Sequence, residues 1–155
     1  ILMSGLSGSG KSTIAKKLAR RMGAIHIRSD AVRKHLGGVP LYEKGGADLY
    51  SPEMTEKTYK RLLELGIKLA ATGYSVILDA KYDREALRQD AIAQSQSHDL
   101  PLQILQCSAP ESVLRDRLNS RSGDITDATA DLLASQIAAA EPFAEAELAY
   151  VTTLD

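Results

Sequence analysis

The chain has 155 residues, of which 44% are hydrophobic and 25% are charged, and its formal net charge is −1. This length suits one compact domain with a substantial core and is too short for two domains. The near-neutral charge argues against broad, sequence-independent binding of nucleic acid, and no apolar run approaches the length of a membrane span.

The first expected element is a short apolar strand at residues 1–3, and it is followed at residues 5–12 by GLSGSGKS, which matches the pattern GxxxxGK followed by Ser or Thr. Glycines in such an octet let backbone N–H groups point at a phosphate, which also faces the positive end of the next helix. Lys11 is expected to span the β- and γ-phosphates of a nucleotide, and the Ser12 hydroxyl is a natural Mg²⁺ ligand. The residues expected to bind nucleotide are Gly5, Ser7, Gly8, Ser9, Gly10, Lys11, Ser12 and Thr13.

Strand and helix patterns alternate along the rest of the chain. Further strands are expected at residues 24–27, 74–78, 102–107 and 149–154. Helices are expected from the octet to about 22, at 30–36, from about 52 to 73, at 83–98, from 108 onward, and in an Ala-rich stretch up to 141. This order predicts a parallel, doubly wound sheet of five strands, with ligands at the carboxyl ends of the strands.

Local signals refine these elements. Ile14, Leu18 and Met22 recur every four residues and are expected to face the core from the first helix. Ser108 and Glu111 have the spacing of a capping box. The single cysteine, at position 107, cannot form an internal disulfide, so we expect a buried thiol in a cytoplasmic protein. The histidines lack metal-ligand spacing, which favours structural roles for His26, His35 and His98.

Two acids follow expected strands at their carboxyl ends. Asp79 ends a run of apolar residues, as a Walker B acid does near a metal, although Asp is also common in ordinary turns. Asp30 could cap the helix that it precedes, or it could position and deprotonate a substrate hydroxyl. Arg33, one helical turn later, would then hold the acceptor or the transferring phosphoryl group. We favour the functional interpretation of both acids.

Two segments interrupt the alternation and are candidate functional regions. Residues 37–52 form an expected glycine-rich loop, and long loops in compact domains are usually functional, so this is the candidate substrate loop. Residues 117–127 form the candidate lid. Arg117 and Arg121 are four residues apart, which places them on one helical face. Phosphoryl transfer needs cations over its developing charge, and a mobile arginine-bearing lid supplies them, whereas the alternative is a solvated surface.

Taken together, these residues resemble the small P-loop kinases of the AAA_33 type, whose relatives include zeta toxin, gluconate kinase, adenylylsulfate kinase and polynucleotide kinase. The segments that carry the resemblance are residues 5–13, 29–33, 76–80 and 114–121. The resemblance implies a three-layer P-loop NTPase fold with strand order 2-3-1-4-5, and an ATP- and Mg²⁺-dependent kinase. It also implies that Asp30 is the catalytic acid and that Arg117 and Arg121 lie in the lid. The nearest group is often fused behind an aminoglycoside-phosphotransferase-like domain, so we expect residues 1–155 to be one domain of a longer chain.

The chain departs from its relatives at three positions. Gluconate and shikimate kinases have Asp-x-Asp where this chain has Arg28 and Asp30, so a metal contact at the first position is expected to be lost. Adenylylsulfate kinase has Ser where this chain has Asp79. In the nearest group we expect Thr where Lys81 stands; this lysine could add a cation near the phosphates or point to solvent.

Three functions are compatible with this pattern. The leading hypothesis is transfer of the γ-phosphoryl group of ATP to a hydroxyl of a small-molecule acceptor, chosen by the loop at residues 37–52. A polynucleotide 5′-hydroxyl kinase is the first alternative, but aromatic platforms for bases are scarce beyond Tyr42 and Tyr50. The second alternative is a nucleotide-binding regulatory domain without transfer, which would need neither Asp30 nor Arg33.

Overall fold

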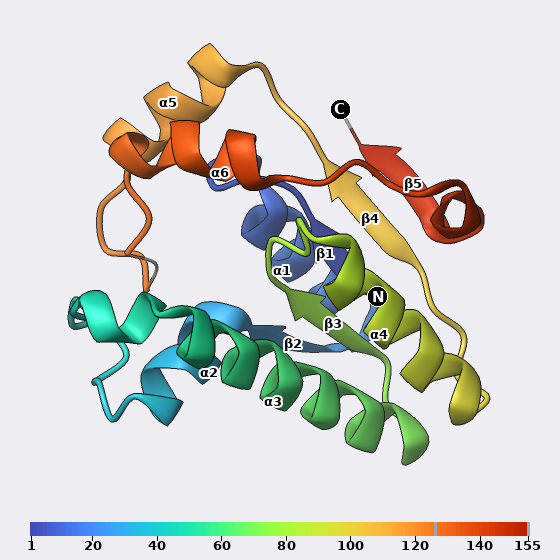
Figure 1. Cartoon of the computed structure of the whole chain (residues 1–155). Coiled ribbons are helices and arrows are strands. Elements are labelled where there is room, and N and C mark those ends of the chain that lie inside the picture. Colours follow the sequence, from blue (N-terminus) through green and yellow to red (C-terminus); the bar gives the residue numbers. More distant parts are fainter. Residues whose placement is uncertain (126, 155) are drawn as a thin grey trace.

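The computed structural model describes residues 1–125 and 127–154. Within these ranges the chain forms a five-stranded sheet with the order β2-β3-β1-β4-β5, in which every neighbouring pair is parallel (Figure 1). The strands are β1 (Leu2–Ser4), β2 (Ile25–Arg28), β3 (Val76–Asp79), β4 (Ile104–Cys107) and β5 (Val151–Leu154). The predicted fold class and strand order are therefore confirmed.

Helices cover both faces of the sheet, with α1 on one face and α3 and α4 on the other (Figure 1). The α-helices are α1 (Lys11–Met22), α2 (Ser29–Leu36), α3 (Pro52–Ala71), α4 (Glu85–Ser97), α5 (Glu111–Asn119) and α6 (Leu133–Ala139). Three 3₁₀ turns are η1 (Ala47–Tyr50), η2 (Ala130–Leu132) and η3 (Glu145–Tyr150). No helix in the described part of the chain is both long enough and apolar enough to cross a membrane.

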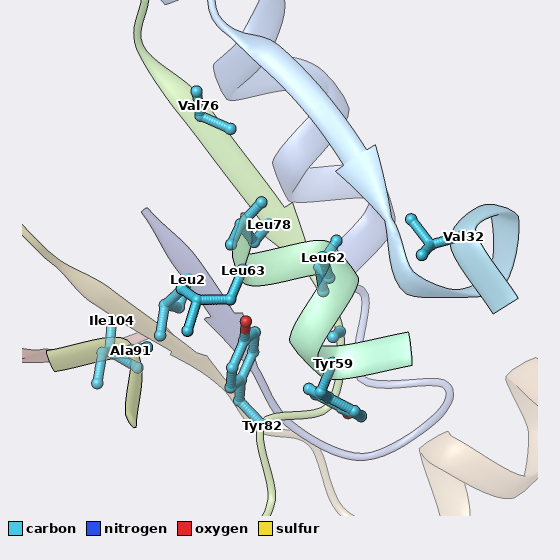
Figure 2. Packing of buried hydrophobic residues seen from close by; sticks show 11 residues of the cluster. Leu2, Val32, Tyr59, Leu62, Leu63, Val76, Leu78, Tyr82, Ala91 and Ile104 are labelled. Carbon is cyan, nitrogen blue, oxygen red and sulfur yellow. The ribbon is translucent and has the colours of Figure 1, made fainter. Parts of the chain in front are cut away.

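The alternation of side chains along each strand divides the core into two layers. Leu2 faces α3 and α4, while the next residue, Met3, faces α1. Figure 2 shows the first layer, where the rings of Tyr59 on α3 and Tyr82 after β3 meet edge to face at 5.2 Å between centroids. Because the central strands β1 and β3 are buried on both faces, their carboxyl ends are held in fixed positions.

The core-facing stripe predicted for α1 is partly wrong. Ala15 and Ala19 are its buried apolar residues, Ile14 and Leu18 pack partly buried at their sides, and Met22 is 48% exposed. The helix thus lies on the sheet through its smallest side chains, which allow the closest approach of backbone to sheet.

Several element ends also differ from expectation. The capping box at Ser108 does not form, because α5 starts at Glu111 with Pro110 in the cap position. The Ser108 amide instead donates to the carbonyl of Leu154, extending the pairing of β4 with β5. The Ala-rich helix α6 ends at Ala139 rather than at 141. By contrast, α3 starts as predicted, with the Ser51 hydroxyl accepting from the Met54 amide.

Candidate active site

The phosphate-binding loop joins β1 to α1 and is shaped by its neighbours as well as by its own glycines. Gly5 has φ 137° and Gly8 has φ 83°, conformations that favour glycine. A Cβ on Gly5 would lie 2.3 Å from the carbonyl oxygen of Cys107, and one on Gly8 would lie 2.8 Å from that of Leu114. Strand β4 and helix α5 therefore leave no room for side chains at these two positions.

Lys11, the first residue of α1, is buried under this loop. Its Nζ donates to the carbonyl of Leu6 at 2.8 Å. Burial lowers the pKa of Lys11 to about 8, although Asp79, Cys107 and Asp30 act in the opposite direction. A buried cation of this kind favours an anion beside it, and nucleotide phosphates would supply one.

Asp79 at the end of β3 is a buried carboxylate with two partners from other elements. Its Oδ2 lies 2.9 Å from Nε2 of His26 on the adjacent strand β2. Burial raises the pKa of Asp79, but the hydrogen bonds from His26 and Ser12 outweigh it, so the pKa lies below its usual value. The two predicted metal ligands, Ser12 and Asp79, therefore lie together. His26 therefore contacts a residue of the site. The sequence did not indicate this contact, because the histidines lack metal-ligand spacing.

Arg28, the last residue of β2, stands among three carboxylates. Its Nη1 lies 2.7 Å from Oδ1 of Asp124, its Nη2 lies 3.7 Å from Oδ2 of Asp30, and its Nε lies 3.8 Å from Oδ2 of Asp79. The sequence indicated only a lost metal contact here. The position of Arg28 at the carboxyl end of a strand was the one sequence signal for a role at the site. Its partner Asp124 could not be inferred in this way, because it lies 96 residues away in sequence.

The two acceptor-side residues predicted from sequence lie on α2. Asp30 is in the first turn, and the cap position belongs to Arg28, which makes no side-chain capping bond. Arg33 is buried: its Nη1 donates to the Leu49 carbonyl and to Thr55 Oγ1, both at 3.0 Å. The Arg33 guanidinium also lies 5.1 Å from the ring centroid of Tyr50. Arg33 thus holds the end of the substrate loop as well as facing the cavity.

One cavity of about 380 Å³ brings most of the predicted site together at the carboxyl ends of the strands. It is lined by Ser7, Gly8, Gly10, Lys11, Ser12, Thr13, Asp30, Arg33, Asp79 and Arg121 among the predicted residues. Gly5, Ser9 and Arg117 do not line it. Arg28, Lys81 and Arg84 do, and the Nζ of Lys81 lies 3.2 Å from Oδ2 of Asp83. Lys81 therefore faces the site and is paired.

The two candidate lid arginines do not share a helical face, because α5 ends at Asn119. Arg117 donates from Nη1 to the carbonyl of Gly8 at 3.1 Å and so supports the phosphate-binding loop. Arg121 lies beyond the helix, lines the cavity and places Nε 3.5 Å from Oδ2 of Asp124. Residue 126 of the candidate lid lies outside the described residues.

The candidate lid and the candidate substrate loop meet at Asp127. Its Oδ2 accepts from the Gly45 amide at 2.9 Å and from the Tyr50 hydroxyl at 2.6 Å, and its Oδ1 lies 3.3 Å from Nζ of Lys34. Lys34 is buried, and it also donates to the carbonyls of Leu41 and Glu43. The two segments, far apart in sequence, are therefore joined by one carboxylate.

A larger groove of about 760 Å³ runs between α3 and α4, and it shares Tyr59 and Leu87 with the cavity. It holds no residue of the phosphate-binding loop, and much of its floor is apolar, with Leu63 and Ile67 among its residues. Size alone thus does not identify the reactive site, whereas the convergence of lysine, arginine and carboxylate side chains does.

Comparison with known proteins agrees with this geometry. A model of the AAA_33 family, described as an AAA domain, matches residues 1–143. The chain is 35% identical over 138 residues to an uncharacterized protein of Mycobacterium tuberculosis; the match covers 86% of this chain and 28% of the relative. The chain thus spans less than a third of that relative's length.

Solved structures of kinases share the fold. A sugar kinase from Janibacter sp. matches with a TM-score of 0.69 and 25% identity, over 99% of this chain and 83% of that one. The Mycobacterium tuberculosis APS kinase CysC, solved in complex with AMPPNP and APS, matches with a TM-score of 0.64 and 22% identity, over 77% of this chain and 67% of that one.

Proposed function

Because the chain belongs to the AAA_33 family of AAA domains, we propose that it is an ATP-dependent kinase that transfers the γ-phosphoryl group to a hydroxyl of a small-molecule acceptor. The observation that carries the proposal is that one cavity is lined by both the phosphate-binding Lys11 and the carboxylate of Asp30. The kinases among its structural neighbours support the reaction type. We propose the same kinase activity for any longer protein that contains this domain.

The donor half of the proposed site is the loop, Lys11 and the start of α1. Backbone N–H groups of the loop and Nζ of Lys11 bind the phosphates of ATP. The Ser12 hydroxyl beside the ionised Asp79 is an oxygen donor set that fits Mg²⁺, which takes one or two carboxylates and completes its shell with phosphates and water. When bound there, Mg²⁺ supplies positive charge to the β- and γ-oxygens.

The acceptor half is the surface between α2, α3 and the candidate substrate loop. Asp30 orients the acceptor hydroxyl and takes its proton as the new oxygen–phosphorus bond forms and the bond to ADP breaks. Lys11 and Arg121 stabilise the charge on the transferring group. Arg33 holds the loop end through Leu49 and shapes the wall against which the acceptor lies. Asp127 holds the loop against the lid, which excludes water from the transfer.

Replacing Asp30 by Asn tests the proposal directly. The amide keeps the shape of the side chain but cannot take the proton, so transfer should fall at least about 100-fold while ATP still binds. Transfer of labelled phosphate to a collection of hydroxyl metabolites measures the first effect, and calorimetry with ATP measures the second. Asp99→Asn at an exposed site beyond α4 is the matched control. Full transfer by the Asp30→Asn variant to a confirmed acceptor would show that Asp30 is not the base.

The two alternatives have less support. A nucleic-acid acceptor needs stacking platforms. Tyr42 and Tyr50 are the exposed aromatics of this loop, but the ring of Tyr50 lies against Arg33 and its hydroxyl binds Asp127. Labelled phosphate on 5′-hydroxyl oligonucleotides, but on no metabolite, would favour that acceptor. A purely regulatory nucleotide-binding domain does not account for Asp30 in the cavity, and isolation of any phosphorylated product would exclude it.

A further inference from the structure

Arg28 occupies the centre of the charged site. It ends β2 and lies opposite Asp79 in the parallel pairing of β2 with β3. Its guanidinium is within 4 Å of carboxylates from three separate segments, namely Asp30 on α2, Asp79 on β3 and Asp124 in the lid. Such a position brings one fixed cation to the carboxyl ends of two adjacent strands, where the phosphates are expected.

Asp124 orients Arg28 together with a second arginine. Its Oδ1 lies 2.7 Å from Nη1 of Arg28, and its Oδ2 lies 3.5 Å from Nε of Arg121. Oδ1 also accepts from the amide of Ile125 at 2.7 Å, which fixes the carboxylate to the backbone of the lid. Both arginines line the cavity, whereas Asp124 does not. The carboxylate therefore stands behind the two guanidinium groups and holds them against the cavity wall.

Two neighbouring guanidinium groups suit an anion with several oxygens. Arginine presents its N–H donors in a planar fork that matches a phosphoryl group, and its charge persists at all relevant pH values. Burial opposes the charged form of Arg28, but the ion pair with Asp124 outweighs it and raises the pKa of Arg28. The pair of arginines is thus a charged, oriented receptor for phosphoryl oxygens.

We propose that Arg28 is a further catalytic residue, which binds the transferring phosphoryl group together with Arg121, and that Asp124 is the positioning residue for both. The inference rests on the proposed kinase function. Arg28 would then contribute a positive charge to the reaction. Relatives with Asp at this position are expected to make a metal contact there instead. Both arginines act as hydrogen-bond donors to the phosphoryl oxygens.

Binding of ADP and aluminium fluoride, an analogue of the transferring group, tests this without knowledge of the acceptor. For Arg28→Gln, calorimetry should show an affinity for ADP with aluminium fluoride about 100-fold lower than that of the wild type, and an affinity for ADP alone within about threefold. Asp124→Asn should lower the analogue affinity about tenfold, because the amide lacks the charge that holds both arginines. Arg115→Gln, which removes an exposed ion pair with Glu111 on α5, is the control and should change neither affinity.

Each other outcome overturns the inference. Unchanged analogue affinity in Arg28→Gln would mean that Arg28 does not touch the phosphoryl group, and equal losses for ADP and for the analogue would assign it a structural role. If Arg28→Gln does not fold, Arg28→Lys serves instead, because it keeps the charge but loses the fork, and about a tenfold selective loss is expected. Failure of the kinase proposal would be seen separately, as wild-type protein that binds the analogue but phosphorylates no acceptor.

Discussion

At the scale of single residues, the site is built from charged groups that share partners. Lys11 is buried and holds a backbone carbonyl, while Asp79 keeps an ionised carboxylate through its hydrogen bonds. Arg28 is shared by three acids. Because each group depends on its neighbours, binding of an anion to this site changes the protonation of the protein as well as its contacts.

The lowered pKa of Lys11 gives a pH-dependent prediction. Burial places this pKa near 8 in the free protein, and bound phosphates should raise it. Binding of ADP should therefore take up protons near pH 8 to 9, and the ADP affinity should fall as the pH rises through about 8. Calorimetry in buffers of different ionisation enthalpy measures the uptake. Lys11→Met should abolish it, and Lys17→Met on the exposed face of α1 should not. Binding without proton uptake at pH 8.5 would contradict the prediction.

The same pKa has a consequence for stability. The pKa of Lys11 is lower in the folded protein than in the unfolded chain. At a pH between the two values the unfolded chain binds a proton at Lys11 that the folded protein does not, and this stabilises the unfolded state relative to the folded one. This cost begins as the pH falls below about 10.5 and is complete below about 8, where it amounts to roughly 3 kcal/mol. Phosphates at the site remove part of this cost, which is a physical reason for nucleotide to stabilise the protein.

At the scale of elements, the candidate substrate loop and lid are tied down rather than loose. Lys34, Asp127 and Tyr50 connect α2, the loop and the lid through short polar contacts. The long loop expected at residues 37–52 contains the 3₁₀ turn η1, which Arg33 holds through the Leu49 carbonyl. The loop and the lid are therefore held to each other by the same contacts.

Removing the Tyr50 hydroxyl tests this view of the loop. Tyr50→Phe keeps the ring over Arg33 but loses the 2.6 Å hydrogen bond to Asp127, at a cost of about 1 kcal/mol. Amide hydrogen exchange at residues 42–50 should become about fivefold faster, because local opening needs less free energy. Tyr42→Phe, at a ring that is 76% exposed, is the control. Equal protection in Tyr50→Phe and wild type would mean that Asp127 does not hold the loop.

These elements also show what can be predicted from sequence. The strands and the phosphate-binding loop follow from local patterns, because GxxxxGK and short apolar runs each carry their own structural requirement. The strand order follows from the resemblance to the small P-loop kinases. The roles of Arg28 and Asp127 do not, since their partners come from segments brought together only by the fold. The helical spacing of Arg117 and Arg121 was misleading for a related reason: α5 ends between them.

At the scale of the whole molecule, a buried ion pair joins α4 to the segment that leads into β5. Arg88 on α4 and Glu147 in η3 are 1% and 0% exposed at their side chains and meet at 2.8 Å. Arg88 also donates to the carbonyls of Tyr82, Glu141 and Pro142, and its guanidinium lies over Phe143. One side chain thus joins the end of the β3 segment, α4 and the chain that leads into the edge strand.

Breaking this pair should lower global stability. Arg88→Met leaves the Glu147 carboxylate buried without its counter-charge, and the free energy of unfolding should fall by about 3 to 5 kcal/mol. Urea denaturation measures the change. Arg115→Met, which removes the exposed pair with Glu111, should cost less than about 1 kcal/mol. A similar small loss in Arg88→Met would show that the buried pair does not stabilise the contact between α4 and η3.

The carboxylate of Asp127 has a thermodynamic consequence for the proposed reaction. It joins the acceptor loop to the lid, so the free energy that one substrate supplies in closing its own side also acts on the other side. Donor and acceptor then increase each other's affinity by the same factor. This coupling disfavours hydrolysis of ATP in the absence of the acceptor. The site closes fully around ATP and excludes water chiefly when the acceptor is also bound.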